Sequence, residues 1–203
     1  YTFPHSTKHV ALYQKFGYWP RYLTAIMTHR MDANSAPSHK GANPAVLLSA
    51  LAKSQREEAT RACARLTDKI DKGLDLAGEI RAVIAQGTGD VLLTYTRGIL
   101  DGFAVCLTGR GSEGGEKTCY VKFAAVRGGA GADERFDKLL EACEAFAASR
   151  QTILEAGVNL AREAAYRRMR SRGYRVAMQG VAMQRPHAAG FNRPDAYVMD
   201  DWR

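Results

Sequence analysis

Residues 127–132, which read Arg-Gly-Gly-Ala-Gly-Ala, are the stretch of this sequence best suited to binding chemistry. They stand between a predicted strand at 118–126 and a predicted helix that begins at Asp133. A glycine-rich turn from a strand into a helix directs backbone N–H groups and the positive end of the helix dipole at one point, which favours phosphate. The same composition is also typical of a flexible turn without a ligand, so both interpretations stay open at this point.

A second notable stretch is residues 9–18, His-Val-Ala-Leu-Tyr-Gln-Lys-Phe-Gly-Tyr, which is followed by Trp19-Pro20-Arg21. The spacing predicts a short helix over 8–17 that ends at its glycine, and then a strand over 22–27. An isolated helix of about ten residues is marginal in water. We therefore expect this helix and strand to pack against something absent from the chain or supplied by another chain.

Together, the order of elements and these two stretches resemble the GNAT superfamily of acetyl-CoA-dependent N-acetyltransferases. The acetyl-CoA loop of that family follows the fourth strand and reads Arg or Gln, two residues, Gly, one residue, then Gly or Ala. Arg127, Gly131 and Ala132 suit this frame, whereas Ala130 replaces the middle glycine. The resemblance implies an acetyl-CoA site made of the following residues: Val126, Arg127, Gly128, Gly129, Gly131 and Ala132.

The resemblance also gives a role to Tyr13. In the family, an apolar residue and a tyrosine, three further residues, a glycine and an aromatic residue close a late helix, and Tyr13 matches the tyrosine. That hydroxyl often protonates the departing CoA thiolate, which is general acid catalysis. The alternative is that Tyr13 only packs its helix.

A damaged second copy of this signature spans residues 159–174. Asn159 and Tyr166 keep the family's seven-residue spacing, but Tyr166 lies seven residues before Gly173, almost one helical turn too early. Counting back from Gly173 places Met169 at the acid position, and a thioether cannot donate a proton.

Two copies imply tandem GNAT-like units. Residues 1–35 would be the tail of a first unit, 36–44 a linker within the Pro- and Gly-containing stretch 31–44, and 45–203 a second, degenerate unit. Because the chain begins with Tyr1 and not Met, we expect it to be processed or truncated.

Charge, apolar content and histidine spacing limit the classes of partner and of protein that the sequence allows. The 29 Lys and Arg residues exceed the 21 Asp and Glu residues, which gives a net charge of +8 and favours anionic partners. The arginines of residues 162–175 fit a solvated helix face better than a nucleic-acid grip, because few aromatic residues lie among them. No apolar run approaches the roughly 18 residues that span a membrane, which excludes a transmembrane protein. The histidines lack ligand spacing, so no metal site is expected.

Cys63, Cys106, Cys119 and Cys143 lie far apart, without a Cys-x-x-Cys pair. Three of them fall inside apolar runs, where cysteine behaves as a small buried hydrophobe. We expect reduced thiols and hence a cytoplasmic protein.

The remaining pattern predicts an α/β fold, with a GNAT-like mixed central sheet flanked by helices. Helices are expected from Pro44 to about Gln86, with a break at Lys72-Gly73. Alternation of strands and helices from 90 to 183 predicts crossover units in one mixed sheet, and a last strand is predicted at 196–199.

The function implied by the resemblance is transfer of an acetyl group from acetyl-CoA to a primary amine, with the Val126 N–H polarising the thioester carbonyl. The alternative is a non-catalytic GNAT-like module that acts as a lid, a homodimerisation surface or a ligand sensor. A third alternative is a basic nucleic-acid-binding protein, which the scarcity of aromatic residues disfavours.

Overall fold

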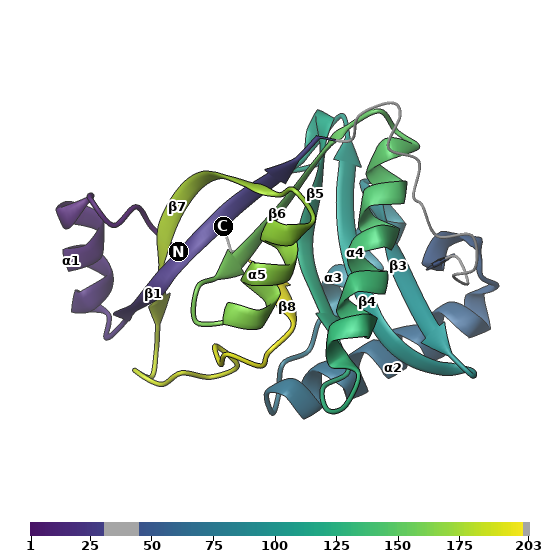
Figure 1. Ribbon diagram of the computed structural model, residues 1–203, viewed down its shortest axis with the longest axis horizontal. Coiled ribbons are helices and arrows are strands. Elements are labelled where there is room, and N and C mark those ends of the chain that lie inside the picture. Colours follow the sequence, from purple (N-terminus) through teal and green to yellow (C-terminus); the bar gives the residue numbers. More distant parts are fainter. Residues whose placement is uncertain (31–44, 201–203) are drawn as a thin grey trace.

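The computed structural model describes residues 1–30 and 45–200. Its centre is one mixed sheet of eight strands, flanked by helices (Figure 1). The strands are β1 (Trp19–His29), β2 (Val46–Leu47), β3 (Gly89–Thr96), β4 (Ile99–Gly109), β5 (Gly115–Val126), β6 (Ile153–Asn159), β7 (Arg175–Gln184) and β8 (Val198–Asp200). The α-helices are α1 (Thr7–Lys15), α2 (Lys53–Ile70), α3 (Ala77–Gln86), α4 (Ala132–Ala148) and α5 (Glu163–Ser171), and Leu48–Ala50 form a 3₁₀ turn, η1.

Neighbouring strands follow the order β2-β3-β4-β5-β6-β1-β7, and β8 pairs with β5 outside this path. The pair β5 and β6 is parallel, and α4 makes the crossover between them. The other pairs described are antiparallel. One mixed sheet therefore spans residues 90–183, as the alternation of strands and helices predicts.

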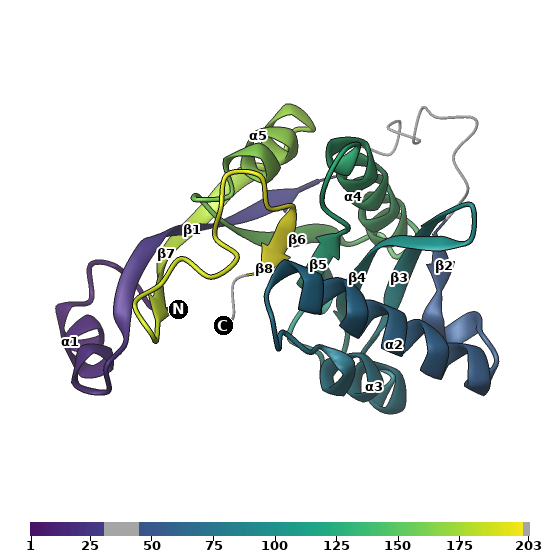
Figure 2. The same ribbon diagram turned by 90° about the horizontal axis from the view of Figure 1, so that it is seen from below.

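In the central strands β3, β4 and β5 both faces of the sheet are buried, and helices cover each face, whereas much of β1 and β7 is exposed. In β4, Phe103 and Val105 point into the core beneath α2 and α3, whereas Ala104 and Cys106 point into the core beneath α4. Figure 2 shows α2 and α3 on one side of the sheet and α4 and α5 on the other. Because successive strand residues face opposite sides, a strand covered twice must be apolar at nearly every position, and β4 is.

The first segment of the chain completes this same sheet. β1 lies between β6 and β7 and is antiparallel to both, with Thr24 opposite Asn159 and Gly180. The expectation that residues 5–27 need a partner absent from the chain or from another chain is therefore wrong for β1. Within residues 1–30 and 45–200 the strands of the two predicted units form one common sheet. The predicted linker, residues 36–44, lies outside the described residues.

The predicted break in the helical region is confirmed, because α2 ends at Ile70 and Gly73 adopts φ +86°, a conformation that glycine tolerates and most residues avoid. The predicted start of this region at Pro44 is wrong, because Val46 and Leu47 pair with β3 as β2 and the first α-helix after them begins at Lys53. All four cysteines are buried free thiols. Among residues 1–30 and 45–200, no helix is long and apolar enough to cross a membrane.

Candidate functional site

The glycine-rich loop lies where the sequence places it, between the end of β5 and the start of α4. Gly129 and Gly131 adopt φ +85° and +75°, and Gly131 is the residue that caps the helix. Side chains with a Cβ rarely adopt this left-handed conformation, so the loop path depends on glycine at both positions. The sequence prediction of a strand–turn–helix junction is confirmed.

Some of the loop's backbone donors are already in use. The Arg127 N–H donates to the carbonyl of Asp101 at 2.7 Å, and the Ala132 N–H donates to the carbonyl of Gly129 at 3.0 Å. No described residue accepts a hydrogen bond from the N–H groups of Gly128, Gly129, Ala130 and Gly131. Those four donors are therefore the ones that the loop can offer to an anion.

Arg135 ties the loop to α4, and sequence reasoning did not single it out. Its Nε donates to the Arg127 carbonyl at 2.9 Å and one Nη donates to the Gly128 carbonyl at 3.0 Å. The carbonyls are thereby turned toward the helix, which leaves the opposite side of the loop to the N–H groups. The signal was an arginine in the first turn of the helix that follows the loop.

The Arg127 guanidinium pairs with a buried carboxylate. Its Nη2 lies 2.9 Å from an oxygen of Asp101 on β4, and the Thr96 hydroxyl donates to the same carboxylate. Arg127 itself is 42% exposed, so part of the guanidinium faces solvent. The side chain is fixed at the loop with donors left over.

The first turn of α4 carries negative charge, which disfavours the binding of an anion there. It carries Asp133 and Glu134, and Asp133 forms an ion pair with Arg168 of α5 at 2.7 Å. The hydrogen bond with Glu134 is the largest of the interactions that lower the pKa of Asp133, so this carboxylate is charged near neutral pH. Negative charge at a helix N-terminus competes with any phosphate for the helix dipole.

A cavity of about 1130 Å³ borders the loop. Val126, Arg127, Gly128 and Gly129 line it near the loop. α2 contributes apolar residues, such as Ala59, Ala62 and Leu66, together with charged ones, such as Glu58 and Arg65, and Tyr197 and Val198 line the side next to β8. This volume is large enough for a small-molecule ligand.

In the part of β5 that leads into the loop, pairing with β6 stops after Val121 and β8 pairs with β5 instead (Figure 2). The Val126 N–H, which the resemblance assigns to the thioester carbonyl, donates to the Tyr197 carbonyl at 3.2 Å. That amide is therefore engaged by the chain's own C-terminal segment.

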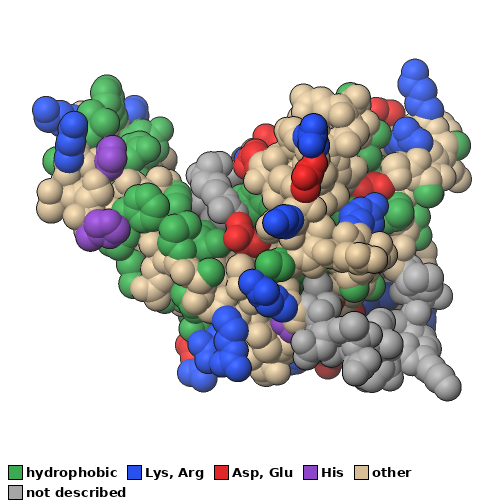
Figure 3. Space-filling model, turned by 90° about the horizontal axis from the view of Figure 1, so that it is seen from above, with side chains coloured by type: hydrophobic (Ala, Val, Ile, Leu, Met, Phe, Trp, Pro, Cys, Tyr) green, Lys and Arg blue, Asp and Glu red, His purple; other side chains and the backbone are tan. Residues whose placement is uncertain are grey.

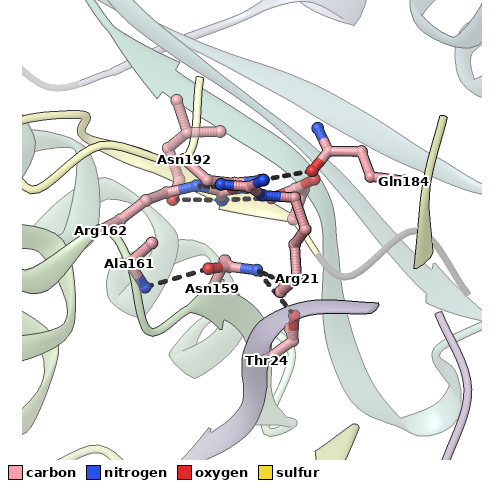
Figure 4. Close-up of polar contacts among 9 residues, drawn as sticks. Arg21, Thr24, Asn159, Ala161, Arg162, Gln184 and Asn192 are labelled. Atoms are coloured by element: carbon pink, nitrogen blue, oxygen red, sulfur yellow. Dashed lines mark hydrogen bonds and ion pairs between the residues drawn. The ribbon is translucent and has the colours of Figure 1, made fainter. Parts of the chain in front are cut away.

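Arg162 holds this C-terminal segment in place, although the sequence pattern predicts that Arg162 lies on a solvated helix face. That interpretation is wrong for Arg162, which is 2% exposed, over the Phe191 ring. Its guanidinium donates to Asp200, to the Val198 carbonyl at 3.0 Å and to Asn192 Oδ1 at 2.7 Å (Figure 4). Periodicity along α5 gives no sign of this network, because its acceptors lie 30 or more residues away.

Other arginines of the same run also bind carboxylates. Arg168 of α5 and Arg172, the residue that caps the end of this helix, pair with acidic residues of α4, and the Arg172–Glu144 distance is 2.6 Å. The hydrogen bond to Glu144 raises the pKa of Arg172 above its ordinary range. In Figure 3, Lys and Arg side chains are scattered among acidic and apolar ones instead of gathering on the face shown. These pairings favour a structural role over a nucleic-acid grip.

Tyr13 does not join the loop. It lies on α1, which Figures 1 and 2 both place at the end of the molecule away from α4. None of the nine described residues of α1 is buried, and the Tyr13 ring meets the edge of Tyr18 at a centroid distance of 6.3 Å. The structure therefore separates the predicted acid from the predicted cofactor loop.

The damaged second signature has structural roles. Asn159 Oδ1 accepts the Ala161 N–H at 3.0 Å, and its amide donates to the Thr24 hydroxyl at 3.4 Å (Figure 4). Met169 is buried in the core beneath α4 and α5, and Tyr166 packs against that core. The thioether of Met169 cannot act as a general acid.

No model of a protein family matches the sequence, and comparison with curated proteins gives no match. The fold does match solved structures. An acetyltransferase of Novosphingobium aromaticivorans, assigned to the GNAT family, aligns with a TM-score of 0.53 at 15% identity, over 91% of this chain and 67% of its own. A GNAT-family acetyltransferase of Colwellia psychrerythraea gives a TM-score of 0.59 at 11% identity, over 89% and 62%.

An acetyltransferase structure from Pyrococcus horikoshii gives a TM-score of 0.62 at 14% identity, and the alignment covers 97% of this chain and 57% of that one. The chain thus spans about two-thirds or less of the length of these structures. At these identities the likeness concerns the fold alone. The chain has the α/β fold of GNAT acetyltransferases, with its mixed sheet flanked by helices.

Proposed function

We propose that this chain belongs to an acyltransferase that moves an acetyl group from acetyl-CoA to a primary amine. The observation that carries the proposal is the glycine-rich loop at the start of α4, which borders a cavity of about 1130 Å³ in a GNAT fold. Backbone N–H groups at a strand-to-helix junction suit a pyrophosphate.

The roles follow the loop. The N–H groups of Gly128, Gly129 and Gly131, with the exposed part of the Arg127 guanidinium, would hold the pyrophosphate of acetyl-CoA. The Ala132 N–H would join them once it has left the Gly129 carbonyl. The bound thioester supplies the acetyl group. The Val126 N–H would donate to its carbonyl once the Tyr197 carbonyl has left, which stabilises the oxyanion.

Tyr13 would act elsewhere. Because α1 lies away from the loop, proton donation by Tyr13 would serve a different site, such as that of another unit or another copy. The cytoplasmic location and the division into units ending at 35 and beginning at 45 likewise remain predictions.

A non-catalytic module is the second candidate, and two observations favour it. The Val126 N–H is already bonded within the chain, and the first turn of α4 carries two acidic residues. Such a module would keep the fold as a lid, a dimerisation surface or a ligand sensor without turning over acetyl-CoA.

Calorimetric titration of acetyl-CoA tests the site, and release of free CoA in the presence of a primary amine separates the two candidates, because only the acyltransferase turns the thioester over. Arg127→Ala should weaken binding roughly tenfold or more, because a hydrogen bond to a charged group contributes about 1.5–3 kcal/mol. Ala130→Gly should leave the affinity equal or better, since it removes a Cβ from the loop. Arg110→Ala, which removes a largely exposed arginine on the turn between β4 and β5, is the matched control. Binding that ignores Arg127→Ala contradicts the acetyl-CoA site.

A further inference from the structure

The gap between β5 and β6 is filled by the chain itself. Parallel pairing of β5 with β6 runs from Thr118 to Val121, and β8 pairs with β5 from Phe123 to Ala125. β8 contacts both strands, and the Val126–Tyr197 hydrogen bond extends its pairing to the cofactor loop. Residues 196–200 thus occupy the free edge of β5 directly beside the candidate site.

This segment is held mainly by side chains. β8 has only three residues, so its ladder contributes few hydrogen bonds. Arg162 and Asp200 form an ion pair in which both side chains are 2% exposed, and Arg162 also holds the Val198 carbonyl and Asn192. In addition, the Pro194 carbonyl accepts the Ala164 N–H at 3.0 Å. The Arg162–Asp200 pair is named the latch below.

We propose that residues 196–200 are an internal plug, which excludes the extended amide-containing arm of acyl-CoA from the edge of β5 until the latch opens. The inference rests on the proposed function. An exposed strand edge binds any extended chain that offers alternating donors and acceptors, and one edge binds one such chain at a time. The Val126 N–H serves either the Tyr197 carbonyl or a ligand carbonyl.

Opening the plug would enlarge the site. Tyr197 and Val198 line the cavity that borders the loop, so their departure joins the cavity to the gap beside β5. When only a fraction of molecules is binding-competent, the apparent affinity falls by that fraction. The plugged chain should therefore bind acetyl-CoA more weakly than a chain with a broken latch.

The first test breaks the latch in the full chain. Asp200→Asn removes the buried countercharge of Arg162, and Arg162→Met removes the other partner. Glu163→Gln is the matched control, because it removes an exposed carboxylate directly beside Arg162 that does not line the cavity. We expect faster hydrogen exchange at the amides of Ala124 and Val126, which face β8, and at least tenfold tighter acetyl-CoA binding in either latch variant, with neither change in the control.

The second test closes the plug. Ala124 and Met199 are directly opposite in the β5–β8 pair, a placement that a disulfide can span. The double variant Ala124→Cys/Met199→Cys should lose acetyl-CoA binding when oxidised and regain it on reduction. Both positions are buried in the folded chain, so the disulfide is formed during refolding under oxidising conditions, and peptide mapping checks that it joins residues 124 and 199 and none of the four native cysteines.

The outcomes separate the plug from the proposed function. If the oxidised double-cysteine variant binds acetyl-CoA, the plug is overturned and the acetyl-CoA site stands. The same holds if a latch variant has exposed β5 amides but binds acetyl-CoA no more tightly than the natural chain. Unchanged exchange in both latch variants overturns the latch. Exposed amides without any acetyl-CoA binding overturn the acetyl-CoA site, and the plug as its competitor falls with it.

Discussion

Replacement of Arg127 by alanine tests how the loop is held in the absence of ligand. Arg127 lies 2.9 Å from the carboxylate of Asp101, which is 1% exposed. Arg110 makes a similar pair with Glu116 at 3.0 Å, but there the carboxylate is 62% exposed. The two pairs have the same chemistry and nearly the same distance, and they differ in the burial of the acid.

The loss of stability expected for Arg127→Ala follows from the burial of Asp101. Two charges about 4 Å apart attract by about 4 kcal/mol at an effective dielectric of 20, before desolvation is subtracted. A hydrogen bond to a charged group retains about 1.5–3 kcal/mol, and water reaches the exposed side of Arg127. The Thr96 hydroxyl remains bonded to Asp101 in the variant. We therefore expect Arg127→Ala to lower the free energy of unfolding by about 2 kcal/mol.

Urea unfolding of Arg127→Ala, Arg110→Ala and the natural chain measures this difference. A loss of about 2 kcal/mol corresponds to a fall in Tm of about 4–8 °C for a chain of this size. Arg110→Ala should leave the midpoint unchanged, because exposed ion pairs contribute little. Adding Asp101→Asn to Arg127→Ala should cost less than the sum of the single changes. Equal losses for Arg127→Ala and Arg110→Ala would refute the reasoning from burial.

The remaining predictions concern buried groups. All four thiols should stay unreactive toward Ellman's reagent in the folded chain and react on unfolding, and rapid labelling without denaturant would contradict their burial. Burial raises the pKa of Cys63 to about 12, whereas an unfolded thiol titrates near 8.5, so its contribution to stability is complete below about pH 8 and is lost as pH rises toward 12. Thermal melts from pH 8 to 11 should therefore fall less steeply for Cys63→Ala; an identical slope would contradict this. Gly102→Ala should destabilise the end of β5, because its Cβ would lie 2.6 Å from Val126 Cγ1 and 2.8 Å from the Ala125 carbonyl, whereas Gly78→Ala on α3 meets nothing and should be neutral or stabilising by circular dichroism melts.

Much of the fold was predictable because its signals are local. The apolar run in β4 and the glycines after β5 report which side chains are buried and where the chain must turn. Gly73 marks the break between α2 and α3 in the same way. These properties depend on residues within a few positions of one another, so the order of strands and helices and the junction at 127–132 could be predicted from the sequence.

Partner choice among distant segments could not be predicted. β1 pairs with β6 across about 130 residues, and Arg162 reaches acceptors at 192, 198 and 200. Periodicity shows that a segment has an apolar face or a free edge, but the partner is decided by backbone hydrogen bonds and packing between remote segments. For the same reason the sequence did not show that Tyr13 lies far from the loop. A family resemblance assigns a role to each position but does not say how far apart the positions lie in this chain.

The sequence by itself therefore determined the α/β class, the buried thiols and the glycine-rich junction, since composition and local spacing suffice for each. Only the tertiary structure decided that β1 completes the sheet, that the arginine at the start of α5 is buried, and that β8 occupies the edge of β5 beside the loop. Each of these three features depends on which distant residues pair with a buried charge or with the open edge of a strand. Those pairings form only when the whole chain packs.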